Sequence, residues 1–155
     1  MKKFEDHLAD IQTDMVAVCV EYADHQADDL YIYCSFEPNM YAFDVFYRIN
    51  GQVVRKHQLN QAVQQTGNLQ TYEYDVSDNR QLAMLKIGIK NLKKIRKKCE
   101  EYNRDMPTEI KLYFDVKQNK LSGKYRYDLV YSNSEVLLPD HIFDAWFEEV
   151  KSQDN

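Results

Sequence analysis

The sequence has little of what catalytic and cofactor sites are built from. Its 155 residues include only four glycines, and these form no glycine-rich phosphate-binding loop. Motifs such as GxSxG and HExxH do not occur. The four histidines stand in separate segments, without the spacing to a cysteine or to another histidine that a metal site requires. We therefore expect a protein that is not an enzyme and that holds neither a cofactor nor a metal.

Cysteines and long apolar runs are scarce as well. Cys19, Cys34 and Cys99 form no CxxC pair, and each lies among apolar neighbours, which predicts free buried thiols in a reducing compartment. No run reaches the roughly 18 apolar residues of a membrane helix. The acids Glu5 and Asp6 near the start are not typical of a secretory signal. We expect a cytoplasmic protein that has no membrane partner.

Two long segments carry apolar residues at steps of three and four, which predicts two amphipathic helices. The first has a stripe of six residues: Phe4, Leu8, Ile11, Met15, Val18 and Tyr22. The second begins near Asp78, with Gln81 three residues on as the partner in a capping box, and ends before Pro107. A short third helix over residues 139–150 carries Trp146 on its apolar side.

Five other segments are typical of strands because they are rich in aromatic and β-branched residues. They are LYIYCSF (30–36), AFDVFYRI (42–49), QVVRKH (52–57), TEIKLYFDV (108–116) and LSGKYRYDLVY (121–131). Asn50 and Gly51 supply the positive φ angles of a type I′ hairpin turn, and residues 60–77 predict a mobile loop. The order α-β-β-β-α-β-β-α predicts one α+β domain over residues 1–155, an antiparallel sheet with helices packed on one face.

The last predicted strand contains closely spaced tyrosines. Tyr125 and Tyr127 alternate with Lys124 and Arg126, so we expect the two rings to pack under the helices, on the face opposite the charges. Tyr131 lies beyond the regular alternation, and we expect it to be exposed. An exposed tyrosine offers a partner a large contact area at low entropy cost.

Charge is distributed unevenly along a chain of net charge −5. Residues 1–78 carry a net charge of −8, residues 79–130 carry +8, and residues 131–155 carry −5. Seven basic residues fall within Lys86–Lys98. They favour either a solvated helix face or phosphate contacts with a nucleic acid, and we take the solvated face as the better interpretation. The acidic ends can steer the protein onto a basic surface.

Two stretches, residues 30–60 and 106–150, together resemble the YezG-like family of bacterial immunity proteins. The resembling features are the paired strands before Asn50-Gly51, the Pro-Thr entry to the fourth strand, the segment Tyr125–Asp128, and the late helix with Trp146. The resemblance implies a cytoplasmic antitoxin that neutralises a cognate toxin, often a nuclease, exported by a type VII secretion system of Gram-positive bacteria. It implies no cofactor and no catalysis.

Two functional hypotheses follow. In the first, the protein is a stoichiometric inhibitor of a toxin, most simply a nuclease, and direct binding to nucleic acid is not expected. In the alternative, it is a nucleic-acid-binding or regulatory module that uses the basic helix Lys86–Lys98. For the first hypothesis the candidate partner-binding residues are acidic or aromatic: Asp24, Asp28, Asp29, Tyr131, Asp140, Asp144 and Glu148.

Overall fold

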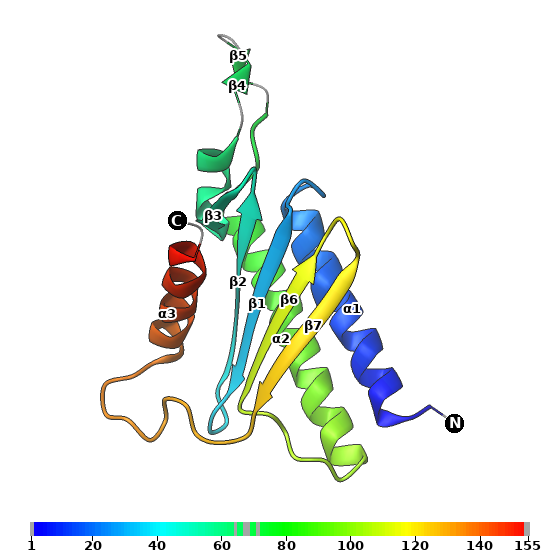
Figure 1. The fold of residues 1–155 in the computed structure, drawn as a ribbon. Helices are drawn as coiled ribbons and strands as arrows, with labels where there is room; N and C mark the ends of the chain where they lie inside the picture. The colour runs from blue at the N-terminus through cyan, green and yellow to red at the C-terminus, as the bar shows by residue number, and fades with distance from the viewer. Residues whose placement is uncertain (1, 64, 67–68, 71, 154–155) are drawn as a thin grey trace.

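The computed structural model describes residues 2–63, 65–66, 69–70 and 72–153 (Figure 1). Along the chain the elements are α1 (Phe4–Tyr22), β1 (Asp29–Phe36), β2 (Tyr41–Ile49), β3 (Gln52–Arg55), the 3-10 helix η1 (Lys56–Ala62), β4 (Gln65–Thr66), β5 (Leu69–Gln70), α2 (Asp78–Glu101), β6 (Glu109–Asp115), β7 (Lys120–Arg126) and α3 (Pro139–Ser152). The predicted α+β class and the order of the main elements are confirmed. Among the described residues, no helix is both long and apolar enough to cross a membrane.

The expected loop over residues 60–77 contains the end of η1 and the small β4–β5 hairpin. Residues 64, 67–68 and 71 of this stretch lie outside the described residues. Its later part packs onto the domain, because Tyr74 is buried and its backbone N–H donates to the Asn60 side chain at 2.7 Å. Mobility of the loop stays a prediction.

The five main strands form one antiparallel sheet in the order β3-β2-β1-β6-β7, with β1 at its centre. The hairpin between β2 and β3 turns at Asn50 and Gly51, whose φ angles are 51° and 78°. Two positive φ angles in succession define the type I′ turn. The hairpin predicted from these two residues is therefore confirmed.

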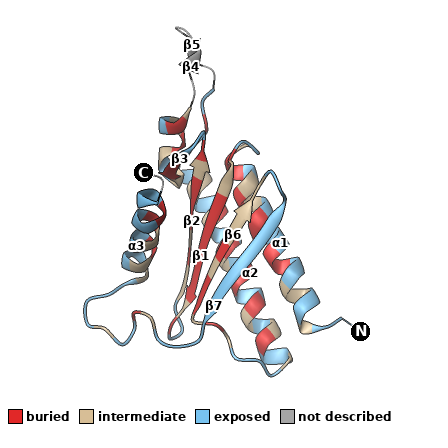
Figure 2. Cartoon of the chain, viewed as in Figure 1, coloured by how far each residue is buried: buried red, intermediate tan, exposed pale blue. Residues whose placement is uncertain are grey.

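Helices cover both faces of the sheet. The two long helices, α1 and α2, lie side by side on one face, as the sequence predicts (Figure 1). The short helix α3 packs on the opposite face, against β2 and β3, instead of joining the same helical layer. The reason lies in β1, whose six central residues are all buried (Figure 2). Both faces of this strand are apolar, so each needs a cover.

Tyr125 and Tyr127 correct the prediction for the last strand. They are 38% and 60% exposed, so the expectation that both rings are packed under the helices is wrong. Regular pairing of β7 ends at Arg126, one residue before Tyr127. In addition, β7 lies at the edge of the sheet, and all its residues are exposed (Figure 2). Tyr125 faces α1, as expected, and its hydroxyl accepts a hydrogen bond there from Gln12.

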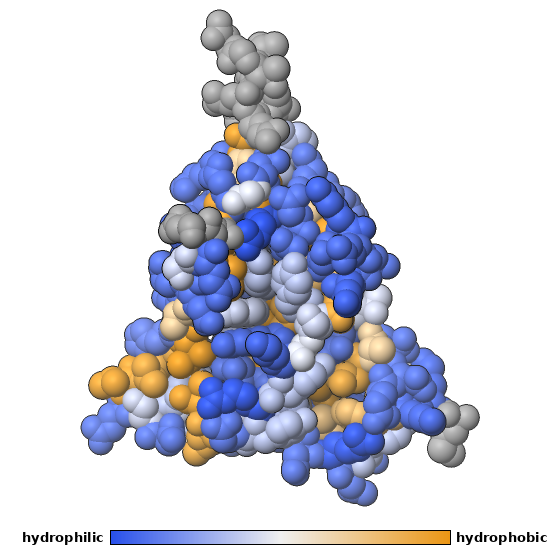
Figure 3. Space-filling view, in the orientation of Figure 1, coloured by the Kyte–Doolittle hydropathy of each residue, from blue (hydrophilic) through white to orange (hydrophobic). Residues whose placement is uncertain are grey.

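Seen from the side that carries α3, the surface is mainly hydrophilic (Figure 3). Apolar groups gather at the lower left, where the linker of residues 127–138 runs from β7 to α3. This linker exposes four aliphatic side chains: Leu129, Val136, Leu137 and Leu138. Val136 is the most exposed of them, at 76%. An exposed apolar cluster of this kind is typical of an interaction surface.

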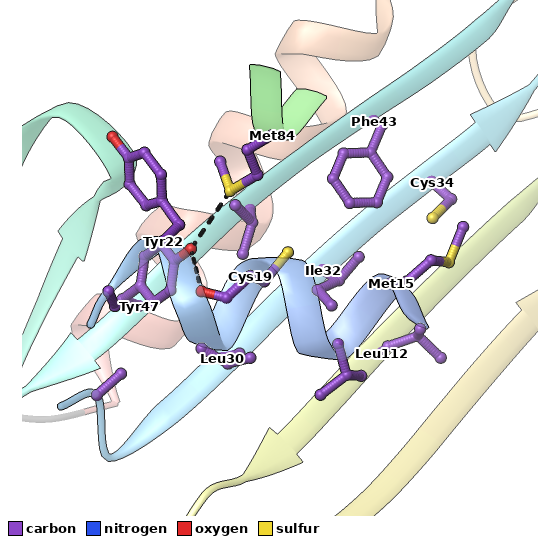
Figure 4. Packing of buried hydrophobic residues seen from close by; sticks show 14 of the residues in the cluster. Met15, Cys19, Tyr22, Leu30, Ile32, Cys34, Phe43, Tyr47, Met84 and Leu112 are labelled. Carbon is purple, nitrogen blue, oxygen red and sulfur yellow. Dashed lines mark hydrogen bonds between the residues drawn. The ribbon is translucent and has the colours of Figure 1, made fainter. Parts of the chain in front are cut away.

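The main core lies between the sheet and the two long helices (Figure 4). The hydroxyl of Tyr47 donates to the backbone carbonyl of Cys19 at 2.9 Å, so this buried polar group is satisfied and ties β2 to α1. The α2 helix approaches β2 closely at Gly88, where a Cβ atom would collide with the ring of Phe43. Ser77 caps α2 by accepting from the N–H of Arg80 at 3.4 Å, one residue earlier than the predicted capping box.

Candidate partner-binding surface

The position of α3 depends on an anchor in the linker that precedes it. One carboxylate oxygen of Glu37, Oε1, accepts hydrogen bonds from the backbone N–H groups of Val130, Tyr131 and Ser132 at 2.9, 3.3 and 3.2 Å. The Ser132 hydroxyl donates to the same oxygen at 2.7 Å. Glu37 is only 2% exposed. Converging backbone donors can stabilise such a buried carboxylate without a cation.

Tyr131 belongs to this anchor and not to the surface. It is 2% exposed, so the expectation of an exposed ring is wrong, and a ring so deeply buried offers a partner no contact area. Its hydroxyl lies 3.1 Å from the Ser35 hydroxyl, and burial raises the pKa of Tyr131 above its ordinary value. Tyr131 is buried because its backbone N–H donates to Glu37, and this hydrogen bond holds the linker against the end of the sheet.

Aromatic packing holds the body of α3 against the sheet. Phe143 and Phe147 are buried in a second core together with Phe46, whose ring lies 5.7 and 5.3 Å from theirs. Trp146 packs edge-on against Phe46 and Tyr31 at 5.1 and 5.9 Å. Such edge-to-face pairs add about 0.5–1.5 kcal/mol each beyond their buried area. This packing holds α3 in a defined position and so positions the residues on its outer side.

The predicted acidic stripe of α3 lies on that outer side. Asp140, Asp144 and Glu148 are exposed, as their spacing of four predicts. Arg55, at the end of β3, contacts two of them: its guanidinium lies 2.6 Å from Asp144 and 3.9 Å from Glu148. The same guanidinium lies 4.1 Å from the centre of the Phe147 ring. One largely buried cation thus lies next to two carboxylates that remain exposed.

A polar cavity of about 360 Å³ separates the start of α3 from β2 and η1. Asp140 and Asp144 line it from α3, and Asp44, Lys56 and His57 line it from the other side. Lys56 pairs with Asp44 at 2.9 Å, and both side chains are about three-quarters buried. The cavity therefore brings two of the predicted partner-binding acids next to a charged cluster that the sequence did not point to.

The other predicted acids lie elsewhere. Asp24 pairs with Arg80 of α2 at 3.3 Å and accepts from the Tyr72 hydroxyl at 2.6 Å. Asp28 is half-buried, and its carboxylate lies 3.5 Å from the backbone nitrogen of Gly51. These contacts connect the α1–β1 turn with α2 and with the β2–β3 hairpin. The structure does not bring these acids together with the acidic stripe of α3.

Asp29 is the first residue of β1, and its carboxylate is occupied by neighbours within the sheet. Arg48 lies 3.1 Å from one oxygen, and the Tyr113 hydroxyl donates to the other at 2.7 Å. Burial, reinforced by this bond, raises the pKa of Tyr113 above its ordinary value. The Asp29 side chain is only 14% exposed. It stabilises the sheet and offers little surface to a partner.

The basic helix is amphipathic, as its sequence pattern predicts, and the choice between a solvated face and phosphate contacts stays a prediction. Leu92 and Ile95 are each 1% exposed and face the core. The outer side presents a row of exposed lysines: Lys86, Lys90, Lys93, Lys94 and Lys97. Lys93 contacts the ring of Tyr41 at 5.6 Å. The row extends over about three turns of α2.

The three cysteines are buried, and one histidine caps a helix. Burial raises the pKa of the Cys19, Cys34 and Cys99 thiols, which disfavours reactive thiolates at neutral pH. His141 accepts a hydrogen bond from the N–H of Leu138 at 3.0 Å and so caps α3. Among the described residues, no group of three or more His, Cys, Asp or Glu side chains has an arrangement suited to a metal ion.

Sequence reasoning found the acids of α3 but missed Arg55 and Glu37, which position that helix and its stripe. Arg55 stands 89 residues from Asp144, and Glu37 stands 93 residues from Val130. No local spacing connects such residues. The one available signal for Glu37 was its place beside Pro38, in a turn between two strongly apolar strands.

Comparison with models of known protein families gives no match to this chain, and comparison with curated proteins gives none either.

Proposed function

We propose that this protein is a cytoplasmic immunity protein that binds a cognate secreted toxin and neutralises it in a stoichiometric complex. The proposal starts from the resemblance to the YezG-like family. The observation that carries it is the continuity of two exposed features: the apolar cluster of the linker ends at Leu138, and the acidic stripe begins at Asp140. Protein interfaces commonly combine an apolar centre with a charged rim.

The acidic stripe fits a toxin that acts on nucleic acid. A nuclease binds a polyanion and therefore carries a basic groove. Acidic residues of an inhibitor accelerate the encounter with such a groove and disfavour wrong partners. Because Arg55 and the aromatic core already hold α3 in place, the stripe loses little freedom on binding, which favours affinity.

Neutralisation in solution tests this function. The protein, immobilised, is used to capture partners from its native cells, and a captured toxin is purified separately. We expect the activity of the toxin to fall in proportion to added protein and to reach zero near one equivalent. A captured partner whose activity is unchanged at a large excess of this protein contradicts the proposal.

A second candidate function uses the lysine row of α2, which is continuous and exposed. In this alternative the protein is a nucleic-acid-binding or regulatory module. Phosphate contacts from such a row make binding strongly salt-dependent. Tight, salt-dependent binding to DNA or RNA by the purified protein alone, lost when Lys86, Lys90 and Lys94 are changed to Gln, favours this alternative over the toxin inhibitor.

A further inference from the structure

The strand β7 forms an open edge of the sheet. It is the last strand in the order and pairs only with β6 among the described residues. All seven of its residues are exposed, as Figure 2 shows. The outer edge of such a strand presents backbone N–H and C=O groups that can pair with another chain.

The hydrogen-bond pattern identifies which backbone groups face outward. At the two ends of β6, Val116 N–H donates to the Asp28 carbonyl at 3.0 Å, and Phe36 N–H donates to the Thr108 carbonyl at 2.9 Å. The backbone N–H and C=O groups of even-numbered β6 residues thus point toward β1. Since these directions alternate along a strand, the backbone groups of odd-numbered β6 residues point toward β7. In the β6–β7 register, odd-numbered residues of β6 stand opposite even-numbered residues of β7, so the backbone groups of these β7 residues point toward β6. The outward-facing residues are Leu121, Gly123 and Tyr125.

The side chains of Leu121 and Tyr125 lie on the α1 side of the sheet, and Gly123, which has no side chain, lies between them. They stand opposite core-facing residues of β6, with Gly123 opposite the buried Leu112. Two clefts separate them from α1, one of about 600 Å³ with Leu121 in its wall and one of about 430 Å³ with Tyr125 in its wall. Gln12 of α1 donates to the Tyr125 hydroxyl at 2.7 Å. Apolar residues such as Val16 and Leu8 complete the two walls.

The other face of β7 is basic. Lys120, Lys124 and Arg126 are all exposed there, in register with Asp115, Lys111 and Glu109 of β6. Arg126 already pairs with Asp128 at 2.6 Å, so Lys120 and Lys124 supply the positive charge. A strand that pairs with the open edge would therefore meet apolar clefts on one side and positive charge on the other. Side chains alternate between the two faces along a strand. The segment that best complements the β7 edge is therefore one in which apolar and acidic residues alternate.

A second copy of this chain is a poor complement. If two β7 strands pair antiparallel about Gly123, the register places Lys120 of one copy opposite Arg126 of the other. Like charges directly opposite each other destabilise a strand pair. Lysines on an edge strand are also a common means of preventing self-association. The charge pattern thus disfavours a second copy and favours an acidic segment.

We propose that the open edge of β7 is a docking site for an extended segment of another protein, in which acidic and apolar side chains alternate. The segment adds a sixth strand, exchanges hydrogen bonds with Leu121, Gly123 and Tyr125, and places apolar side chains toward the two clefts. This site is separate from the acidic stripe of α3, and it does not depend on the identity of a toxin.

Synthetic peptides test the site directly. The probe is a capped heptapeptide, Glu-Val-Glu-Leu-Glu-Val-Glu, titrated into the isotope-labelled protein and followed by NMR. We expect saturable binding with a Kd below about 1 mM. The largest changes in amide chemical shift should occur at Leu121, Gly123 and Tyr125. No saturation at this concentration, or shifts centred on α3, overturns the proposal. A concentration-dependent dimer through β7 overturns it in favour of a second copy.

Two controls separate strand pairing from charge attraction. N-methylation of the alternate peptide amides that face β7 should weaken binding by at least about tenfold, whereas N-methylation of the outward amides should change it by less than about twofold. Lys124→Glu should weaken binding of the acidic peptide, while Lys97→Glu, the same charge change on α2, should not. Equal effects within either pair show that the peptide binds by charge alone.

Discussion

Ser132 donates two hydrogen bonds to a single oxygen of Glu37, from its backbone N–H at 3.2 Å and from its hydroxyl at 2.7 Å. Glu37 follows β1, and Ser132 lies in the linker that leads to α3. This contact therefore connects the centre of the sheet to the segment that carries the apolar cluster and the acidic stripe. Whatever surface α3 offers to a partner depends on this buried carboxylate.

Replacing Glu37 by Ala should release the linker and destabilise the protein by about 2–4 kcal/mol, because one buried and two partly buried backbone donors lose their acceptor. Trp146 is the only tryptophan of the chain, so its fluorescence reports the docking of α3. We expect a lower Tm and a red-shifted emission. Glu135→Ala, which removes an exposed acid of the same linker, is the matched control. Unchanged emission in the Glu37 variant would show that α3 docks without the anchor.

The close approach of α2 to the sheet gives a second prediction. Gly88→Ala gains about 1 kcal/mol of helix propensity, yet the new Cβ collides with the Phe43 ring, and overpacking costs about 1–3 kcal/mol. We expect net destabilisation in urea unfolding. In the background Phe43→Leu the same change should cost less, which a double-mutant cycle measures. A stabilised single variant would contradict the packing.

Local signals were sufficient for the hairpin and for the long helices, because turn chemistry and periodicity act over a few residues. Asn50 and Gly51 adopt the expected positive φ angles. The sequence pattern favours helices on one face of the sheet, whereas α3 lies on the other. This prediction was wrong because an apolar stripe fits either side of a sheet. The missed signal was the run LYIYCSF, which is apolar at consecutive positions. A strand of this kind is buried on both faces and predicts a cover on each.

The candidate site was predicted only in part, for a physical reason. The spacing of Asp140, Asp144 and Glu148 places them on one side of any helix. Their cation, Arg55, comes from a distant strand, and only the assembled fold brings it there. Tyr131 was misplaced because the residue that holds its backbone, Glu37, stands 94 residues away in the sequence, and no local pattern indicates that contact.

Glu109 gives a prediction for pH dependence. It is 3% exposed, and burial raises the pKa of its carboxyl above the ordinary 4.5, with Lys111 at 3.9 Å offsetting part of the effect. Since the folded-state pKa exceeds the unfolded-state pKa, the folded state binds the proton more tightly. The carboxyl therefore contributes stability below the unfolded-state pKa, and this contribution is lost as the pH rises through the folded-state pKa.

We accordingly expect Glu109→Gln to have a higher Tm than the wild type at about pH 7, and this advantage to vanish at about pH 4, where both side chains are uncharged. Thermal unfolding across this range measures the difference. Glu73→Gln, at an exposed position, should show no comparable trend. An advantage of Glu109→Gln that does not depend on pH would mean that amide hydrogen bonds, and not proton release, are responsible.

The acidic stripe gives the last prediction, which applies to the purified complex with the toxin that the proposed function requires. Because Asp144 is paired with Arg55, charge reversal would disturb the docking of α3, so neutral isosteres are the better test. Asp140→Asn, Asp144→Asn and Glu148→Gln together should slow association by about three- to tenfold at low salt and flatten its dependence on ionic strength. The dissociation rate should change less, because rim charges act mainly on the encounter.

Neutralising Lys90, Lys94 and Lys97 to Gln is the control for this triple variant, since it changes three exposed charges of the opposite sign on the other side of the sheet. Stopped-flow association rates are measured at several salt concentrations, and Tm values confirm that both variants are folded. We expect the lysine variant to bind within about tenfold of the wild type, equivalent to about 1.4 kcal/mol. If the acidic variant keeps the wild-type rate and salt slope, steering by α3 is wrong. The apolar cluster around Val136 and Leu138 is then the better account of toxin binding.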